Sequence, residues 1–193
     1  MSEEDIVQGC VKHDSQCQKL LYESYSNQVL AICNRYAATS EEANELFWFG
    51  VKNIFDHIKT YVEENEKRKS GVGVMPLQTW IKREIVLAAA QLMHRGKKQH
   101  FVSSTINTRD VQKITTEEIS DEAIMQKASP STIFQALRTL TPLYRTVYNM
   151  YELDNYSYEE ISKILDVSEY ISKDSLLKAK FNLKKSIIKI ISL

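Results

Sequence analysis

An all-α fold of two small helical domains joined by a linker is predicted for this chain of 193 residues. Only five glycines and three prolines occur, too few for the many turns of an all-β fold. Apolar residues recur at three- and four-residue steps, as on the buried faces of helices. Residues 101–128 lack this period apart from a short helical piece near 119–125, so they predict a linker between domains at 1–100 and 129–193.

Three long helices are predicted in the first domain. One extends over about 16–37, where apolar residues occupy one face at helical spacing. Ser40 followed by two glutamates begins a second helix, whose apolar period continues to about Tyr61. A charged, glycine-containing loop is expected over 63–73, and the third helix ends near Gly96.

Serine and proline positions mark two helix starts in the second domain. Ser129 or Ser131 can cap a helix that continues to Leu140. Pro142 lies just inside the next helix, which continues to Leu153, and the first helical position is one that proline favours.

Two helices joined by a three-residue turn end the second domain. They are predicted over 158–165 and 169–191, with Ser168 as the N-cap of the second helix. This is the outline of a helix-turn-helix, whose second helix enters the major groove of DNA, and a simple helical hairpin is the alternative. Its apolar face is expected to contain Ile171, Leu176, Ala179 and Leu183. The groove-facing residues are predicted to be Glu169, Tyr170, Ser172, Lys173 and Ser175, with Lys178, Lys180, Lys184 and Lys185 extending a basic surface.

Charge is distributed unevenly along the chain, although the formal net charge is zero. Residues 1–64 carry 5 basic and 11 acidic side chains, whereas 65–100 carry 8 and 2. Residues 101–160 carry 5 basic and 9 acidic side chains, and residues 161–193 carry 7 basic and 3 acidic side chains. The two basic blocks can be two phosphate-binding faces, and solvated helix faces are the alternative.

A pattern of about 50 residues begins at Ala136 and covers both C-terminal helices. It resembles region four of the extracytoplasmic-function group of bacterial RNA polymerase sigma factors. Asn155 stands where that family has Gly, a mild change because Asn tolerates the left-handed turn conformation. Lys178 and Lys180 stand where it has Arg. The matching residues are Tyr144, Arg145, Val147, Tyr156, Ser157, Glu160, Ile161, Leu165, Val167, Ser168, Ser172, Lys173, Leu176, Ala179 and Leu183.

The N-terminal half carries a second set of matches, at Asp5, Ile6, Val7, Gly9, Cys10, Asp14, Leu21, Tyr22, Tyr25, Ile32, Cys33, Arg35, Tyr36, Trp80, Ile81, Lys82 and Arg83. These residues resemble region two of the same family. Two sites depart from the family pattern. Trp48 and Phe49 stand where Gln and Glu are usual, and Leu87 and Gln91 stand where Asn and Asp are usual on the helix that opens the minus-ten element.

The resemblance implies a sigma factor, which binds core RNA polymerase and directs it to promoter DNA. In the family, region two docks on the clamp helices of the beta-prime subunit and reads the minus-ten element as single strand. Region four reads the minus-thirty-five duplex. The implied polymerase-binding residues are Glu45, Trp48, Phe49 and Lys52, and the implied DNA-binding set adds Arg145, Lys82, Arg83, Arg95, Lys97 and Lys98. An anti-sigma factor is a further implied partner.

Other readings of the function stay open. Leu87 and Gln91 favour a degenerate sigma-like protein that acts as an interaction module without promoter melting, and a stand-alone helix-turn-helix regulator is a third hypothesis. An enzyme is not expected, because no phosphate-binding glycine loop and no nucleophile–base motif occurs. No cofactor is expected. The acidic N-terminus and the lack of a long apolar run predict a cytoplasmic protein without membrane insertion.

Two residue clusters have competing interpretations. Cys10, His13 and Cys17 share a helix face and could bind zinc with Cys33, but buried thiols are the favoured interpretation, so no metal is predicted. Three consecutive aromatic residues at 47–49 cannot all face one core, because adjacent helical residues point about 100° apart. Trp48 or Phe49 should therefore be exposed and form a partner surface.

Overall fold

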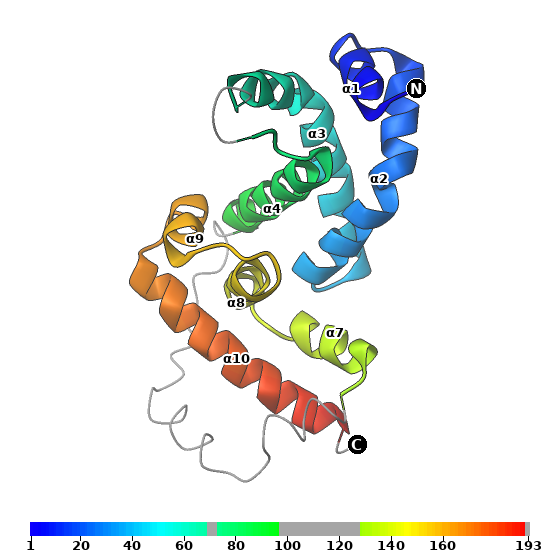
Figure 1. Ribbon diagram of the computed structural model, residues 1–193. Coiled ribbons are helices and arrows are strands. Elements are labelled where there is room, and N and C mark those ends of the chain that lie inside the picture. Colours follow the sequence, from blue (N-terminus) through cyan, green and yellow to red (C-terminus); the bar gives the residue numbers. More distant parts are fainter. Residues whose placement is uncertain (69–72, 97–127, 192–193) are drawn as a thin grey trace. The chain divides into compact units, whose positions relative to one another are not determined.

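The computed structural model describes residues 1–68, 73–96 and 128–191, and the regular elements within these ranges are all helices (Figure 1). The chain divides into two compact units. Unit 1 contains Met1–Asn34 and Ser40–Ala89, and unit 2 contains Arg35–Thr39 and Ala90–Leu193. The all-α prediction is confirmed. The predicted linker and its short helical piece at 119–125 lie outside the described residues.

Unit 1 begins with two helices, α1 (Glu3–Val11) and α2 (Ser15–Tyr36), whose last two residues cluster with unit 2. A capping box starts α1, because the Ser2 hydroxyl accepts from the Asp5 N–H at 3.1 Å and the Asp5 carboxylate accepts from the Ser2 N–H at 2.9 Å. A Cβ on Gly9 would collide with the Cys17 side chain, so a glycine is needed where α1 turns into α2.

Helix α3 (Ser40–Arg68) and helix α4 (Leu77–Gly96) up to Ala89 complete unit 1, and the last turns of α4 cluster with unit 2. Trp80 of α4 is 2% exposed and packs on Tyr61 of α3, with ring centroids 5.1 Å apart. Beside them, the buried Glu84 carboxylate lies 2.8 Å from the His57 ring nitrogen. Glu84 is one of the few charged residues in this apolar core, and the imidazole satisfies its carboxylate across the helix pair.

Helix α3 is longer than predicted. The charged loop expected from residue 63 is wrong up to Arg68, which ends the helix. Asn65 explains the extension because its amide accepts from the Met75 N–H at 2.8 Å and donates to the Met75 carbonyl at 3.0 Å. Tyr61 donates to the same carbonyl at 3.1 Å. These bonds to residues further along the chain hold the last turns of α3 helical, although those turns have no apolar period.

The three cysteines are buried in the core of unit 1, where they fill space as small apolar side chains. Burial raises the pKa of Cys10 to about 11 and that of Cys33 to about 12, so both remain protonated thiols at neutral pH. Within the described ranges no three His, Cys, Asp or Glu side chains lie close enough together to hold a metal ion.

Unit 2 contains α7 (Pro130–Arg138), α8 (Pro142–Tyr148), a π-helical turn η1 (Asn149–Leu153), α9 (Tyr158–Leu165) and α10 (Glu169–Ile191). The long helix α10 packs against α7, α8 and α9 (Figure 1). Ser129 caps α7, as predicted, and Pro142 occupies the first turn of α8. One core cluster contains Ala136, Leu137, Leu140, Ala179, Leu183 and Ile187.

None of the helices in the described part of the chain is long and apolar enough to cross a membrane.

Candidate functional site

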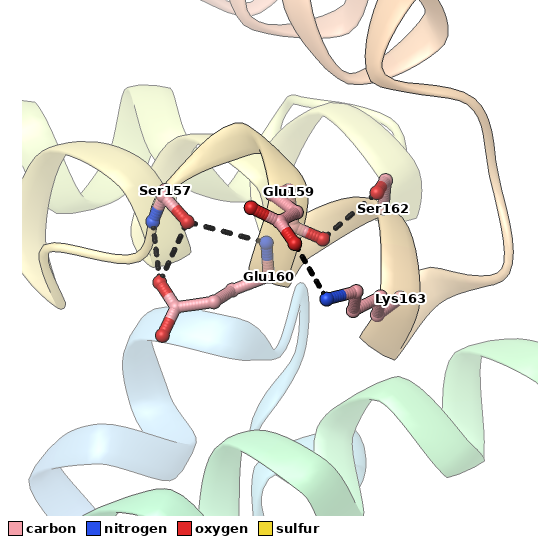
Figure 2. A network of polar contacts seen from close by, with 5 residues as sticks. All are labelled: Ser157, Glu159, Glu160, Ser162 and Lys163. Atoms are coloured by element: carbon pink, nitrogen blue, oxygen red, sulfur yellow. Dashed lines mark hydrogen bonds and ion pairs between the residues drawn. The ribbon is translucent and has the colours of Figure 1, made fainter.

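The helix-turn-helix of unit 2 starts from a well-capped α9. Ser157 and Glu160 form a capping box, in which the Glu160 carboxylate accepts from the Ser157 N–H and hydroxyl, each at 2.8 Å (Figure 2). On the same short helix, Lys163 pairs with Glu159 at 2.6 Å, and the Ser162 hydroxyl donates to the Glu159 carbonyl. The capping box defines the start of this helix of only eight residues, and the other two bonds stabilise its turns.

The turn between α9 and α10 is as short as predicted. Asp166 ends α9 in the left-handed conformation, with φ at 49°, a region that Asp and Asn tolerate better than most residues. The Val167 N–H then donates to the Ser162 carbonyl at 3.1 Å. Ser168 caps α10, since its hydroxyl accepts from the Ile171 N–H at 3.2 Å, which confirms the predicted N-cap.

The buried face of α10 differs from the predicted one. Ser172 and Ser175 are 0% and 2% exposed, so both are inside the helix packing and the prediction that they face a DNA groove is wrong. Ile171, predicted in the core, is 42% exposed. The buried positions 172, 175, 176 and 179 follow the helical period, but two of them hold serine, which hid the register from a search for apolar residues.

The exposed face of the first turns of α10 is mainly apolar. Tyr170 is 77% exposed and Leu177 is 50% exposed, and seven residues, or two turns, separate them. They therefore lie nearly in line along the helix, opposite the buried serines. Ile171 flanks this line. Leu177 was assigned to neither face in the sequence analysis, because a single leucine beside Leu176 carries no signal that it is exposed.

Three lysines in the first half of α10 are matched with acidic partners. Lys173 lies 3.4 Å from Glu169 and its ammonium is 5.3 Å from the centre of the Tyr158 ring. Lys178 lies 2.8 Å from Asp174, and this hydrogen bond raises the pKa of the lysine. Lys180 pairs with Glu152 at 2.7 Å. The start of α10 consequently offers little unbalanced positive charge.

Arg145 is a buried residue that stabilises the packing of unit 2. Its side chain is buried, with 3% of the residue exposed, and one guanidinium nitrogen donates to the carbonyls of Leu140 at 2.8 Å and Arg138 at 3.3 Å. These are carbonyls at the end of α7, which a helix leaves without partners. The predicted contact of Arg145 with DNA is a misassignment, because the guanidinium holds α7 against α8.

The basic residues predicted on α4 have different environments. Lys82 is half-buried, whereas Arg83 is exposed and lies 3.8 Å from Glu64 of α3. Arg95 is exposed near the end of the helix. Lys97 and Lys98 lie outside the described residues. At the second of the two sites that depart from the pattern described above, Leu87 is half-buried and Gln91 is exposed.

A second candidate surface lies on α3, where Glu45, Trp48, Phe49 and Lys52 fall on one side of the helix. Trp48 is 56% exposed, Phe49 is half-buried, and Phe47 points inward with 7% exposure. Glu45 is exposed, and Lys52 forms an ion pair with Asp56. Helix geometry thus places one ring of the three in the core and leaves another on the surface, as expected.

Trp48 is supported by rings from two helices. Its ring lies 5.2 Å from Phe47 in an edge-to-face pair and 6.3 Å from Tyr22 of α2 in a stacked pair. Tyr22, missed as a surface residue, also borders a small apolar depression that Val51 and Phe55 help to line. No short-range sequence signal links Tyr22 to Trp48, because 26 positions separate them in the chain.

Comparison with known family models finds a match within the C-terminal unit. Residues 132–169 match the family model for Sigma-70, region 4. A search of curated proteins gives no match. The chain is also similar to a solved structure of the sigma factor RpoE from Bartonella quintana in complex with the anti-sigma factor NepR, with 14% identity over 89% of this chain and 96% of that chain and a TM-score of 0.43. The family match confirms the predicted resemblance to sigma region four over these residues.

Proposed function

We propose that this protein is a sigma factor that binds core RNA polymerase and directs transcription initiation. The observation that carries the proposal is the Sigma-70 region 4 match, which covers the turn and ends at the first residue of α10. In this proposal unit 2 contacts the minus-thirty-five duplex, and unit 1 docks on the polymerase and contacts the minus-ten element. Polymerase as the partner would place the protein in the cytoplasm, and an anti-sigma factor would regulate it.

The DNA contacts proposed for unit 2 start at the exposed N-terminal turns of α10. A helix in the major groove reads base edges with its first residues and contacts phosphates with basic residues beside the groove. Glu169, Tyr170 and Lys173 are exposed there. Lys178 and Lys180 lie further along and are proposed to contact phosphates. Each would then exchange its carboxylate partner for a phosphate.

The polymerase contact proposed for unit 1 uses the exposed side of α3. A half-exposed tryptophan held by two neighbouring rings is the kind of anchor that dominates protein interfaces. Glu45 and Lys52 flank Trp48 on the same side and give the interface a polar edge. Lys82, Arg83 and Arg95 of α4, with Lys97 and Lys98, are proposed to contact the phosphates of minus-ten DNA.

The test is a pull-down of the full chain with core polymerase, followed by runoff transcription on genomic DNA fragments. Binding together with specific transcripts is the expected result. If neither binding nor transcripts are found, the sigma proposal is wrong and a stand-alone helix-turn-helix regulator remains. Binding without transcription would support the second candidate described below.

A matched pair of variants tests the proposed docking side of α3. Substituting Trp48→Gln together with Phe49→Glu restores the residue types usual in the family and should change the affinity for core polymerase. Leu30→Gln on α2 is the control, since Leu30 is 43% exposed and also apolar. Equal effects of the two variants on polymerase affinity would show that Trp48 is not a specific anchor.

The second candidate is a sigma-like interaction module that binds polymerase without melting DNA. Leu87 and Gln91 favour it, because Leu87 replaces a polar residue usual in the family and Gln91 replaces a charged one with a neutral amide. Gln91 is exposed and could still make a hydrogen bond, whereas half-buried Leu87 cannot. Permanganate footprinting of thymines on a bound promoter separates the two candidates, since only a melting factor exposes them.

A further inference from the structure

The chemistry of the exposed surface at the start of α10 indicates what kind of base contact this helix can make. Residues 169–178 carry two lysines and two acids, so their net charge is zero. Both lysines are paired with those acids, at 3.4 Å and 2.8 Å. The helix contains no arginine, the residue that most often reads guanine by a bidentate contact.

Apolar side chains make up the remainder of this surface. Tyr170, Ile171 and Leu177 are 77%, 42% and 50% exposed. In the major groove, the apolar group available to such side chains is the C5-methyl group of thymine. Exposed leucine and isoleucine offer no hydrogen bond to any base, so methyl contact is the direct readout open to them.

The spacing of these side chains fits a groove. Tyr170 and Leu177 lie nearly in line and are separated by about 10.5 Å along the helix axis. This length corresponds to about three base pairs of duplex at 3.4 Å each. Ser172 and Ser175 are buried on the opposite side of α10, so the face that carries Tyr170 and Leu177 points away from the core of unit 2.

We propose that α10 recognises duplex DNA through thymine methyl groups, with Tyr170 and Leu177 contacting thymines about three base pairs apart. The inference rests on the proposed DNA-binding function of unit 2 and names the base chemistry of that site. Lys173 is held between Glu169 and the Tyr158 ring. It makes a secondary contact with DNA, either to a phosphate or to a single guanine.

The experiment compares duplexes of equal length that differ only in the thymine methyl. Affinity of the full chain is measured at one salt concentration for an alternating dA·dT duplex and for an alternating dA·dU duplex. We expect the dT duplex to bind more tightly by about fourfold for each contacted methyl, from the transfer free energy of a single buried CH₂ group. Equal affinities would overturn the inference and leave duplex binding intact.

Two variants connect the methyl effect to α10. Leu177→Ala should bring the dT to dU affinity ratio closer to one. Phe134→Ala is the control, because Phe134 is an apolar side chain of α7 with 40% exposure, and it should leave the ratio unchanged. If Leu177→Ala leaves the ratio unchanged, the apolar face lies outside the groove and a protein partner becomes its occupant. If no salt-dependent duplex binding occurs, the proposed function of unit 2 fails as well.

Discussion

Helices α3 of unit 1 and α10 of unit 2 both expose apolar side chains, but the two helices support them differently. On α3, Trp48 contacts the rings of Phe47 and Tyr22, so buried and exposed aromatic residues form one cluster. On α10, the buried face has small residues, among them Ser172 and Ser175, and Tyr170 on the other face is 77% exposed.

The difference suggests two kinds of partner. A ring that is already held in place loses little conformational entropy on binding, which suits a protein interface with a central anchor. Small residues on a buried face allow helices to approach closely and leave the opposite face projecting, which suits insertion into a groove. Exposed apolar residues of one chain can thus suit either a protein partner or a DNA groove, depending on whether rings or small residues are packed on the buried side of the helix.

The largest expected effect is the loss of Phe47. Phe47→Ala should cost about 3–5 kcal/mol of unfolding free energy, because it leaves a cavity under the ring cluster. Trp48→Ala should cost less, since Trp48 is already half exposed, while weakening partner binding more. Urea denaturation of both variants measures the difference. Similar costs for both would remove the distinction between core and surface rings on α3.

The next largest effect is expected for Arg145→Met, which leaves the carbonyls of Arg138 and Leu140 without their guanidinium donor. Each buried carbonyl that loses its partner should cost about 1–3 kcal/mol. Thermal melting measures the loss. Where the variant remains folded, its duplex affinity should equal that of the wild type. A folded variant with weakened DNA binding would show that Arg145 contacts DNA after all.

Two substitutions on α10 test which of its faces is buried, one enlarging a buried residue and one shortening an exposed residue. Ser175→Leu should destabilise unit 2 by about 1–3 kcal/mol, because it adds volume to a packed seam. Leu177→Ser, two residues away on the exposed side, should change stability by less than about 0.5 kcal/mol. The melting temperatures of the two variants measure the difference. If Leu177→Ser were the more destabilising variant, Leu177 would be the buried residue and the prediction that the serines face the groove would be correct.

The smallest effect concerns the capping box of α1. Hydrogen bonds from the side chain and backbone of Ser2 lower the pKa of Asp5 below its ordinary value. The folded state therefore gains stability above the unfolded pKa and loses it as the pH falls through the lowered pKa of Asp5. NMR titration of Asp5 checks the direction. In Asp5→Asn this part of the acid dependence should disappear, and an unchanged stability profile below pH 4 would contradict the prediction.

The predictions from sequence succeeded where a feature is determined by contacts between residues close together in the chain. The bounds of α9 and α10, the turn between them and the Ser168 cap follow from contacts over five residues or fewer, and all were predicted correctly. The end of α3 was not, since Asn65 is held by Met75 across ten positions. The ring contact of Tyr22 with Trp48 likewise joins two helices and has no local signature.

Helical period and capping residues are therefore sufficient to locate most helices of this protein and its helix-turn-helix, because neighbouring residues alone form helical hydrogen bonds and caps. Which face of each helix is buried depends on packing against distant segments. Ser172 and Ser175 lie inside because α10 packs closely there, and Arg145 points inward because the end of α7 offers it carbonyls. Small polar residues can occupy a core when neighbours leave little space, so polarity alone does not reveal the surface.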